Sequence, residues 1–291
     1  MSEIKVFKSN SWESYELLDT GGGEKLERVG KYKFARPYED AVWPKSRQWV
    51  DVDGKFLSTK TGGKGQWEFK NSKAKESQII EYKGIKFKIE PTPFRHFGFF
   101  PEQASHWDFI ETTIKNAGRP VKFLNLFGYT GVASLFALRA GAEVTHLDAS
   151  KESINWAKEN QKLNADLVEA PMRVIIDDAL KFLEREIKRG NEYDAIIMDP
   201  PKFGRGPKGE VWKIEEDLSK LLTKLPSLIS NKPLFIILTS YAIDSSSLSL
   251  GYALKNALKD LNGGVEQGEL CLSEKSTGRD IPLANTAVWK A

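Results

Sequence analysis

The chain contains almost no cysteine: Cys271 is the single one among 291 residues. A framework of intrachain disulfides is therefore excluded, and we expect a reducing compartment. Long apolar runs are also missing, because none is long enough to cross a bilayer as a helix. The first residues, M-S-E-I-K-V-F-K, lack the apolar core of a signal peptide. These absences together predict a cytoplasmic protein.

A strong charge of either sign is absent too. The formal net charge is +3, from 43 Lys and Arg against 40 Asp and Glu. This balance permits a polyanionic partner without requiring one. Apolar residues make up 40% of the chain, which is enough for a sizeable core and argues against disorder. A chain of this length can hold one large domain, or a large and a small one.

Residues 121–148 have the pattern of a strand, a turn, a helix and a second strand. A short apolar run precedes a turn that contains Gly128 and Gly131, and an apolar helical run follows over residues 132–140. A second apolar run ends in Asp148. This is one βαβ unit with a carboxylate at the tip of its second strand. Such a unit can hold a nucleoside at the carboxyl edge of a parallel sheet, with the ribose on the acid.

Strand and helix patterns alternate through the rest of the chain. Further strands are predicted at 172–176, 193–198, 234–238, 267–273 and 286–290, and helices at 151–163, 179–188, 215–225 and 248–261. Ser150 is the expected N-cap of the first of these helices. The alternation predicts an α/β fold with a doubly wound, Rossmann-like sheet. No helix separates the last two strands, so we expect the sheet to end antiparallel.

Residues 1–90 differ from the rest, because glycine is frequent and helical periodicity is weak. Strand-like pieces occur at 15–18, 31–34, 49–52, 78–82 and 85–89, and Lys83-Gly84 has the pattern of a tight hairpin turn. We expect a small β-rich domain over 1–90. Pro91-Thr92-Pro93 marks the boundary to a second domain over 91–291.

Lysines and aromatic residues alternate in the second half of this N-terminal region. The lysines are Lys55, Lys60, Lys64, Lys70, Lys73 and Lys75, and the aromatics are Phe56, Trp67 and Phe69. Such a mixture could bind single-stranded nucleic acid. We favour a solvated loop with packed rings, because Glu68 and Glu76 dilute the charge.

His96 and His106 could be catalytic bases. No carboxylate or cysteine stands at a recognisable spacing from either one. We therefore expect structural or surface roles for both.

The glycine turn does not have the spacing of a dinucleotide site. In G-x-G-x-x-G, taking Gly128 and Gly131 as the last two glycines puts the first on Leu126. Taking Gly128 as the first puts the others on Thr130 and Ala133. A dinucleotide needs these glycines because the backbone approaches a pyrophosphate closely. A cofactor without phosphates, such as S-adenosylmethionine, removes that demand.

Acids follow two successive predicted strands. Asp148 can accept both ribose hydroxyls, and Asp178 can accept from an adenine amino group. The alternative is that Asp177 and Asp178 cap the helix that follows them. Two acids beside one glycine turn favour a nucleoside site more than either acid alone.

The most specific pattern is Asp199-Pro200-Pro201-Lys202-Phe203, which follows an apolar strand. The prolines fix the backbone and remove two amide donors, so that rigid carbonyls lie beside the Asp199 carboxylate. Acceptors in this arrangement can hold a planar amine or amide, and a nearby ring can stack on a base. The alternative is a simple turn at the end of a strand.

These motifs resemble the class I S-adenosylmethionine-dependent methyltransferases. The similarity lies in N-L-F-G-Y-T-G at 125–131, Asp148, Asp178 and D-P-P-K-F at 199–203. More narrowly, the chain resembles the branch that includes the bacterial 23S ribosomal RNA large-subunit cytosine methyltransferases. The resemblance covers residues 94–291, and residues 22–30 are similar to a sequence that precedes the catalytic domain in relatives.

The resemblance implies a seven-stranded sheet with an antiparallel last strand, S-adenosylmethionine as cofactor and an RNA acceptor, in the first place ribosomal RNA. It implies cofactor contacts from Phe100, Gln103, Asn125, Phe127, Gly128, Tyr129, Thr130, Gly131, Asp148 and Asp178. It assigns Asp199, Pro200, Pro201, Lys202 and Phe203 to the transfer itself. Neither a metal nor a particular oligomeric state is implied.

One departure from that branch narrows the chemistry. Methylation at C5 of cytosine requires a thiolate that adds to the ring, and in those enzymes it follows the fourth or fifth strand. Here these places hold D-P-P-K and, at 238–241, L-T-S-Y, whereas Cys271 falls inside a late strand. We therefore expect direct transfer to an amine, a ring nitrogen or an oxygen. The alternatives are a small-molecule or protein methyltransferase, a nicotinamide-dependent oxidoreductase, and a non-catalytic RNA-binding module.

Overall fold

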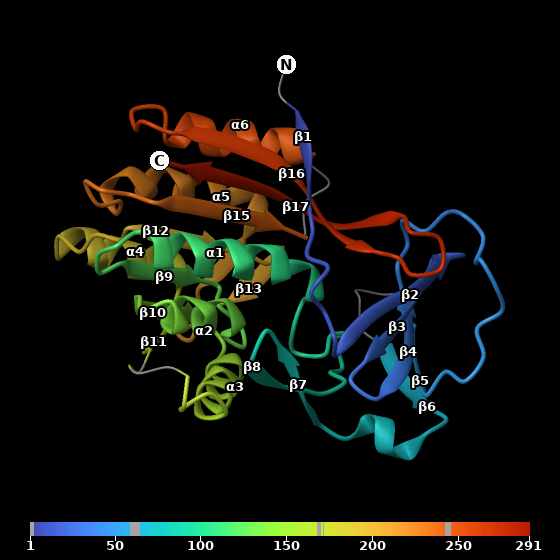
Figure 1. Cartoon of the computed structure of the whole chain (residues 1–291). Helices are drawn as coiled ribbons and strands as arrows, with labels where there is room; N and C mark the ends of the chain where they lie inside the picture. Colours follow the sequence, from blue (N-terminus) through green and yellow to red (C-terminus); the bar gives the residue numbers. More distant parts are fainter. Residues whose placement is uncertain (1–2, 59–64, 168–169, 171, 242–245) are drawn as a thin grey trace. The chain divides into compact units, whose positions relative to one another are not determined.

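In the computed structural model the chain forms two compact units (Figure 1). The structure describes residues 3–58, 65–167, 170, 172–241 and 246–291. The sheet unit comprises Met1–Phe7, Ser105–Leu270 and Pro282–Ala291, and the β-rich unit comprises Lys8–Ala104 and Cys271–Ile281. The division at residue 90 predicted from sequence texture stays a prediction. The packing groups residues 91–104 with the β-rich unit.

An eight-stranded sheet forms the centre of the sheet unit. Its order is β1 (Ile4–Phe7), β16 (Gly264–Ser273), β17 (Asp280–Lys290), β15 (Phe235–Ser240), β12 (Ala195–Met198), β9 (Lys122–Leu126), β10 (Glu143–Asp148) and β11 (Arg173–Ile176). The five strands from β15 to β11 are parallel, and β17 is antiparallel to β15. The predicted seven strands and the antiparallel end are confirmed. The N-terminal strand β1 adds an eighth, parallel to β16.

Helices cover both faces of this sheet (Figure 1). They are α1 (Ala104–Asn116), α2 (Val132–Arg139), α3 (Lys151–Lys162), α4 (Ala179–Lys188), α5 (Ile214–Lys224) and α6 (Ser247–Ala257). Side chains of α4, α5 and α6 share one buried apolar cluster with strands β9, β12 and β15. On the other face, Trp107 of α1 stacks on Phe136 of α2 with ring centroids 5.6 Å apart. The doubly wound arrangement is thus confirmed.

Capping side chains set where the helices begin. Ser150 accepts from the backbone N–H of Ser153 at 3.2 Å and starts α3 one residue later, as the sequence predicts. Ser246 caps α6 in the same way. Each cap satisfies one of the amide donors left open at a helix start. No helix among the described residues is long and apolar enough to span a membrane.

The β-rich unit contains a five-stranded sheet and a separate hairpin. The sheet has the order β2 (Tyr15–Gly21), β3 (Glu24–Val29), β4 (Tyr32–Pro37), β5 (Gly54–Ser58) and β6 (Gly65–Phe69), and the hairpin is β7 (Gln78–Tyr82) with β8 (Ile85–Ile89). Lys83 and Gly84 both have positive φ, 47° and 85°, as the predicted tight turn requires. The strand predicted at 49–52 is wrong. This segment is irregular, and Trp49 donates to Asp19 at 2.6 Å.

Aromatic rings form the core of the β-rich unit. The ring of Trp67 lies 5.6 Å from Phe34, 5.3 Å from Phe56 and 5.2 Å from Phe97, and its Nε1 donates to the carbonyl of Thr92. These contacts agree with the interpretation of these aromatics as packed rings. Lys60 and Lys64 lie outside the described residues.

Candidate active site

The glycine turn joins β9 to α2 at the carboxyl edge of the sheet. Phe127, Tyr129 and Gly131 all have positive φ, at 58°, 51° and 82°. This region is uncommon for residues other than glycine. The conformation is held because the Gly128 N–H donates to Leu147 at 2.9 Å and the Gly131 N–H donates back to Gly128 at 3.0 Å. Such strained backbone is typical of functional sites.

Packing explains both glycines. A Cβ added at Gly128 would lie 2.3 Å from Cε1 of His146, and one at Gly131 would lie 2.9 Å from Cβ of Ala157. Both distances are shorter than ordinary carbon contacts. The turn therefore needs glycine because side chains below it leave no room. This explanation does not depend on any phosphate.

Buried polar side chains support the turn from below. Asn125 donates to Ser134 Oγ at 2.9 Å, and Ser134 Oγ lies 3.0 Å from Nδ1 of His146. From α3, Asn160 donates to the carbonyl of Thr130 at 2.9 Å. Burial lowers the pKa of His146 to about 4, so its imidazole is neutral near pH 7. Sequence analysis missed Ser134, His146 and Asn160, whose only signal is a polar residue within an apolar run.

Asp148 ends β10 directly beside the turn. Its Oδ2 accepts from the backbone N–H of Tyr129 at 2.9 Å, and its Oδ1 accepts from that of Ser150 at 2.8 Å. Burial raises the pKa of this carboxyl. Within the part of the chain that the structure describes, no cation pairs with it. The predicted contact between acid and turn is present, and each carboxylate oxygen retains capacity for a further donor.

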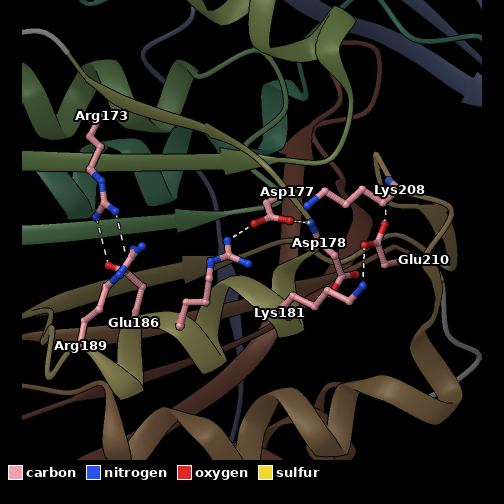
Figure 2. Close-up of polar contacts among 9 residues, drawn as sticks. Arg173, Asp177, Asp178, Lys181, Glu186, Arg189, Lys208 and Glu210 are labelled. Carbon is pink, nitrogen blue, oxygen red and sulfur yellow. Dashed lines mark hydrogen bonds and ion pairs between the residues drawn. The ribbon is translucent and has the colours of Figure 1, made fainter.

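Asp177 and Asp178 follow β11 and begin α4 (Figure 2). Asp178 is the N-cap and accepts from the N–H of Lys181 at 3.0 Å. Asp177 accepts from the Asp178 N–H at 2.9 Å and pairs with Arg185. The helix-cap alternative is therefore present in the structure. An adenine contact from the second oxygen of Asp178 stays a prediction.

The Asp-Pro-Pro motif follows β12, which pairs with β9 so that Met198 lies opposite Leu126. Asp199 therefore leaves the sheet next to the start of the glycine turn. The carbonyl of Pro201 accepts from Nε1 of Trp212 at 2.7 Å, so it is already engaged. Lys202 and Phe203 are exposed.

Residues 203–213 form a short hairpin after the Asp-Pro-Pro motif. Its strands are β13 (Phe203–Arg205) and β14 (Val211–Lys213), and Gly204 lies opposite Trp212. The ring of Trp212 is buried and lies 4.9 Å from that of Phe127 in the glycine turn. Through Trp212, the base of the hairpin thus contacts both the Asp-Pro-Pro motif and the glycine turn.

The remaining candidates belong to other segments of the chain. Phe100 and Gln103 belong to the β-rich unit, and their contact with a cofactor stays a prediction. His106 is buried, with Nε2 2.9 Å from Oγ1 of Thr286, as a structural role requires. Burial, with help from Arg36, lowers the pKa of His96 to about 3. Cys271 is buried within β16, which confirms its expected place in the core.

Solved structures contain the same fold. The methyltransferase described as S-adenosylmethionine-dependent from Agrobacterium tumefaciens is 41% identical, with a TM-score of 0.92, over 98% of this chain and 93% of that one. A protein from Streptococcus mutans described as a putative S-adenosylmethionine-dependent methyltransferase is 16% identical. It has a TM-score of 0.73 over 97% of this chain and 76% of that one, and at this identity it supports the fold alone.

Curated relatives share part of the chain. The ribosomal RNA large subunit methyltransferase K/L of Pseudoalteromonas atlantica is 34% identical over 60% of this chain and 24% of that protein. The ribosomal RNA large subunit methyltransferase K of Neisseria meningitidis is 29% identical over 68% of this chain and 55% of that protein. The chain thus spans about a quarter to about half of the length of these relatives.

Residues 46–256 match the model of a family described as S-adenosylmethionine-dependent methyltransferase. The matched residues make up most of the chain. This match agrees with the strand order, the glycine turn and the acid at the end of β10. The chain belongs to the S-adenosylmethionine-dependent methyltransferase family.

Proposed function

We propose that this chain transfers a methyl group from S-adenosylmethionine directly to a nitrogen or another nucleophile of RNA, in the first place ribosomal RNA in the cytoplasm. The observation that carries the proposal is the position of Asp199 and Pro200 beside the glycine turn, at the carboxyl edge of the sheet. The names of the curated relatives support ribosomal RNA as the acceptor.

The residues at this edge fit the cofactor. Gly128 and Gly131 let the turn lie directly on His146 and Ala157. Asp148 offers two carboxylate oxygens whose observed partners are backbone N–H groups. In the proposal Asp148 accepts from the ribose hydroxyls and Asp178 from the adenine amino group. Phe127, Tyr129 and Thr130 border the cofactor. Asn125 holds the turn from below. Phe100 and Gln103 are kept as proposed cofactor contacts.

S-adenosylmethionine, when bound, supplies an electrophilic methyl group. The protein's task is then to position an acceptor and exclude water. The Asp199 carboxylate and the Pro200 carbonyl can accept the two hydrogens of a planar amine, which directs its lone pair out of the plane. After transfer, the surplus proton can leave through the Asp199 carboxylate to solvent.

The position of the single cysteine favours direct transfer of the methyl group over a mechanism in which a thiolate adds to a ring carbon of the acceptor. Addition at cytosine requires a thiolate at the acceptor. Cys271 is the single cysteine of the sequence, and it is buried within β16. An attack by an amine, ring nitrogen or oxygen needs no such group.

Asp199→Ala tests the proposed role. We expect transfer of labelled methyl groups to RNA from a deletion strain to fall by about 10²–10³-fold, as when one polar stabiliser of a transition state is lost. Affinity for S-adenosylhomocysteine, measured by calorimetry, should stay near that of the parent. Asp260→Ala, an exposed acid beyond α6, is the matched control. Unchanged transfer in Asp199→Ala would remove this residue from the mechanism.

Two further measurements test the cofactor and the acceptor. Calorimetry should show binding of S-adenosylhomocysteine and none of NAD, and the opposite result would contradict the family assignment for this site. Mass spectrometry of nucleosides from a deletion strain should show one methylated nucleoside missing from ribosomal RNA. An unchanged nucleoside profile would turn the proposal towards a small-molecule or protein acceptor.

A further inference from the structure

The β13–β14 hairpin has two different faces. The register places Phe203 opposite Lys213, Gly204 opposite Trp212 and Arg205 opposite Val211. Because side chains alternate along a strand, Gly204 and Trp212 share one face and the other four residues share the opposite face. Trp212 is 4% exposed, whereas Phe203 is 53% exposed and Val211 is 47% exposed. We call the second face the outer face.

Polar and apolar contacts fix the base of the hairpin. Trp212 donates to Pro201 at 2.7 Å, and the N–H of Ile214 donates to the carbonyl of Lys202 at 3.1 Å. Near the tip, Glu210 accepts from Lys181 of α4 at 2.7 Å, as Figure 2 shows. The outer face is therefore held in place and does not need an additional partner to order it.

The outer face and the tip are rich in cations. Lys202, Arg205 and Lys208 are exposed, and within the described ranges none of them forms an ion pair. The guanidinium of Arg205 lies over the ring of Phe203 at 5.9 Å. The neighbouring acid, Glu210, already pairs with Lys181. Lys213 pairs with the exposed Glu216 at 2.7 Å.

An exposed ring flanked by cations that form no ion pair among the described residues matches one class of ligand. Single-stranded nucleic acid offers unstacked bases to an aromatic ring and phosphates to Arg and Lys. A duplex does not offer its bases in this way. An apolar protein surface would satisfy Phe203 and Val211, but it would leave three exposed cations without partners.

We propose that the outer face and the tip of the hairpin bind single-stranded RNA next to the methyl acceptor, with a base stacked on Phe203 and phosphates held by Arg205 on the outer face and Lys208 at the tip. This inference rests on the proposed RNA methylation, and it names the form in which the RNA is held. Because β13 begins two residues after Pro201, a nucleotide bound here is one or a few positions from the one that is methylated.

Fluorescence anisotropy with a short labelled single-stranded RNA, in the presence of S-adenosylhomocysteine, tests the inference. For Arg205→Glu with Lys208→Glu, we expect affinity to fall by about tenfold or more. The slope of log affinity against log salt should flatten by about 0.7 for each lost phosphate contact. For Phe203→Ala we expect about a tenfold loss with an unchanged salt slope, since stacking involves no counterions.

Matched controls lie on and just beyond α6. Lys255→Glu with Lys259→Glu makes the same change of charge, and Tyr252→Ala removes a ring that is 60% exposed. These variants should bind RNA like the parent. Melting temperature and calorimetry with S-adenosylhomocysteine confirm that every variant is folded and retains its cofactor site.

The outcomes separate the two proposals. If the parent binds no single-stranded RNA, the proposed substrate class is wrong. If the parent binds and the hairpin variants bind equally well, the hairpin assignment is wrong and the proposed function stands. Tighter binding of the same strand as a duplex would also overturn the inference. So would hairpin variants that keep RNA affinity but lose affinity for a ribosomal protein.

Discussion

Two carboxylates of the sheet unit, Asp148 at the end of β10 and Glu186 on α4, have opposite electrostatic environments. Glu186 of α4 is fully buried and accepts from Arg173 (3.0 and 3.2 Å), Arg189 (2.9 Å), Asn191 (2.9 Å) and Tyr193 (2.7 Å). Burial alone would raise its pKa, but these hydrogen bonds outweigh burial and lower it to about 2. Burial raises the pKa of Asp148, and its observed partners are backbone N–H groups.

The two carboxylates lie at opposite edges of the sheet. Arg173 opens β11 and Tyr193 precedes β12, so Glu186 lies at the amino edge, whereas Asp148 closes β10 at the carboxyl edge. Figure 2 shows the Glu186 cluster and the Asp177–Asp178 end of the same helix separately. One edge satisfies its carboxylate internally and gains stability. The other retains acceptor capacity for a ligand, at some cost in stability.

The largest loss of unfolding free energy should come from Glu186→Ala. Removing this carboxylate takes away the acceptor of several hydrogen bonds, among them that of the buried Tyr193 hydroxyl, so we expect the free energy of unfolding to fall by about 3 kcal/mol. Urea unfolding measures the change. Glu184→Ala, on the same helix, breaks an exposed pair with Lys224 and should cost no more than about 1 kcal/mol. Equal costs for the two variants would break the comparison.

Asp148→Asn should weaken cofactor binding while it leaves the stability of the fold nearly unchanged. One backbone N–H loses its acceptor, but a buried charge with a raised pKa disappears as well, so we expect unfolding to change by less than about 1 kcal/mol. Affinity for S-adenosylhomocysteine should fall by about tenfold or more, because hydrogen bonds to a charged group are the stronger ones. Calorimetry and urea unfolding on the same preparation give both values. A large loss of stability with normal affinity would reverse the assigned roles.

Gly128→Ala tests whether the turn is shaped by the side chain below it. The added methyl meets the ring of His146, and we expect a loss of about 1–3 kcal/mol in unfolding free energy, typical of overpacking. Combined with His146→Ala, the same substitution should cost less than it does alone. A double-mutant cycle by urea unfolding measures this coupling. Additive costs would show that the methyl is accommodated in another way.

The stability that Glu186 contributes should also depend on pH. The folded pKa of Glu186, about 2, lies below its ordinary value of 4.5, so its contribution is complete above pH 4.5. It is lost progressively as pH falls from 4.5 towards 2. The difference in unfolding free energy between the parent and Glu186→Gln should therefore be constant near pH 7 and narrow below pH 4.5. If this difference in unfolding free energy instead widened as pH falls, the pKa of Glu186 would not be lowered by folding.

Local patterns predicted much of the fold and part of the site. The βαβ unit at 121–148, the Ser150 cap and the antiparallel end followed from periodicity and caps, which act within a few residues. β1 was not predicted because its four residues are largely exposed and pair with a distant strand. The hairpin at 203–213 was missed because each of its strands has three residues.

The residues that support the glycine turn from below could not be predicted either, because they are distant from it in sequence. Gly128 is required by His146, eighteen positions further along the chain, and only the folded sheet brings the two together. The second role of Asp178, as a helix cap, was visible as an alternative. The choice between cap and ligand depends on which of its oxygens remains available, and sequence carries no information about this.

The pairing of β1 with β16 has a consequence for biosynthesis. Lys5 and Glu266, joined at 2.6 Å, are separated by 261 positions. Translation proceeds at about 5–20 residues per second, so β1 waits on the order of tens of seconds before its partner leaves the ribosome. During this interval Ile4 and Val6 belong to an unpaired segment, while the central strands already have their neighbours. β1 is thus made long before the strand that fixes its place in the sheet.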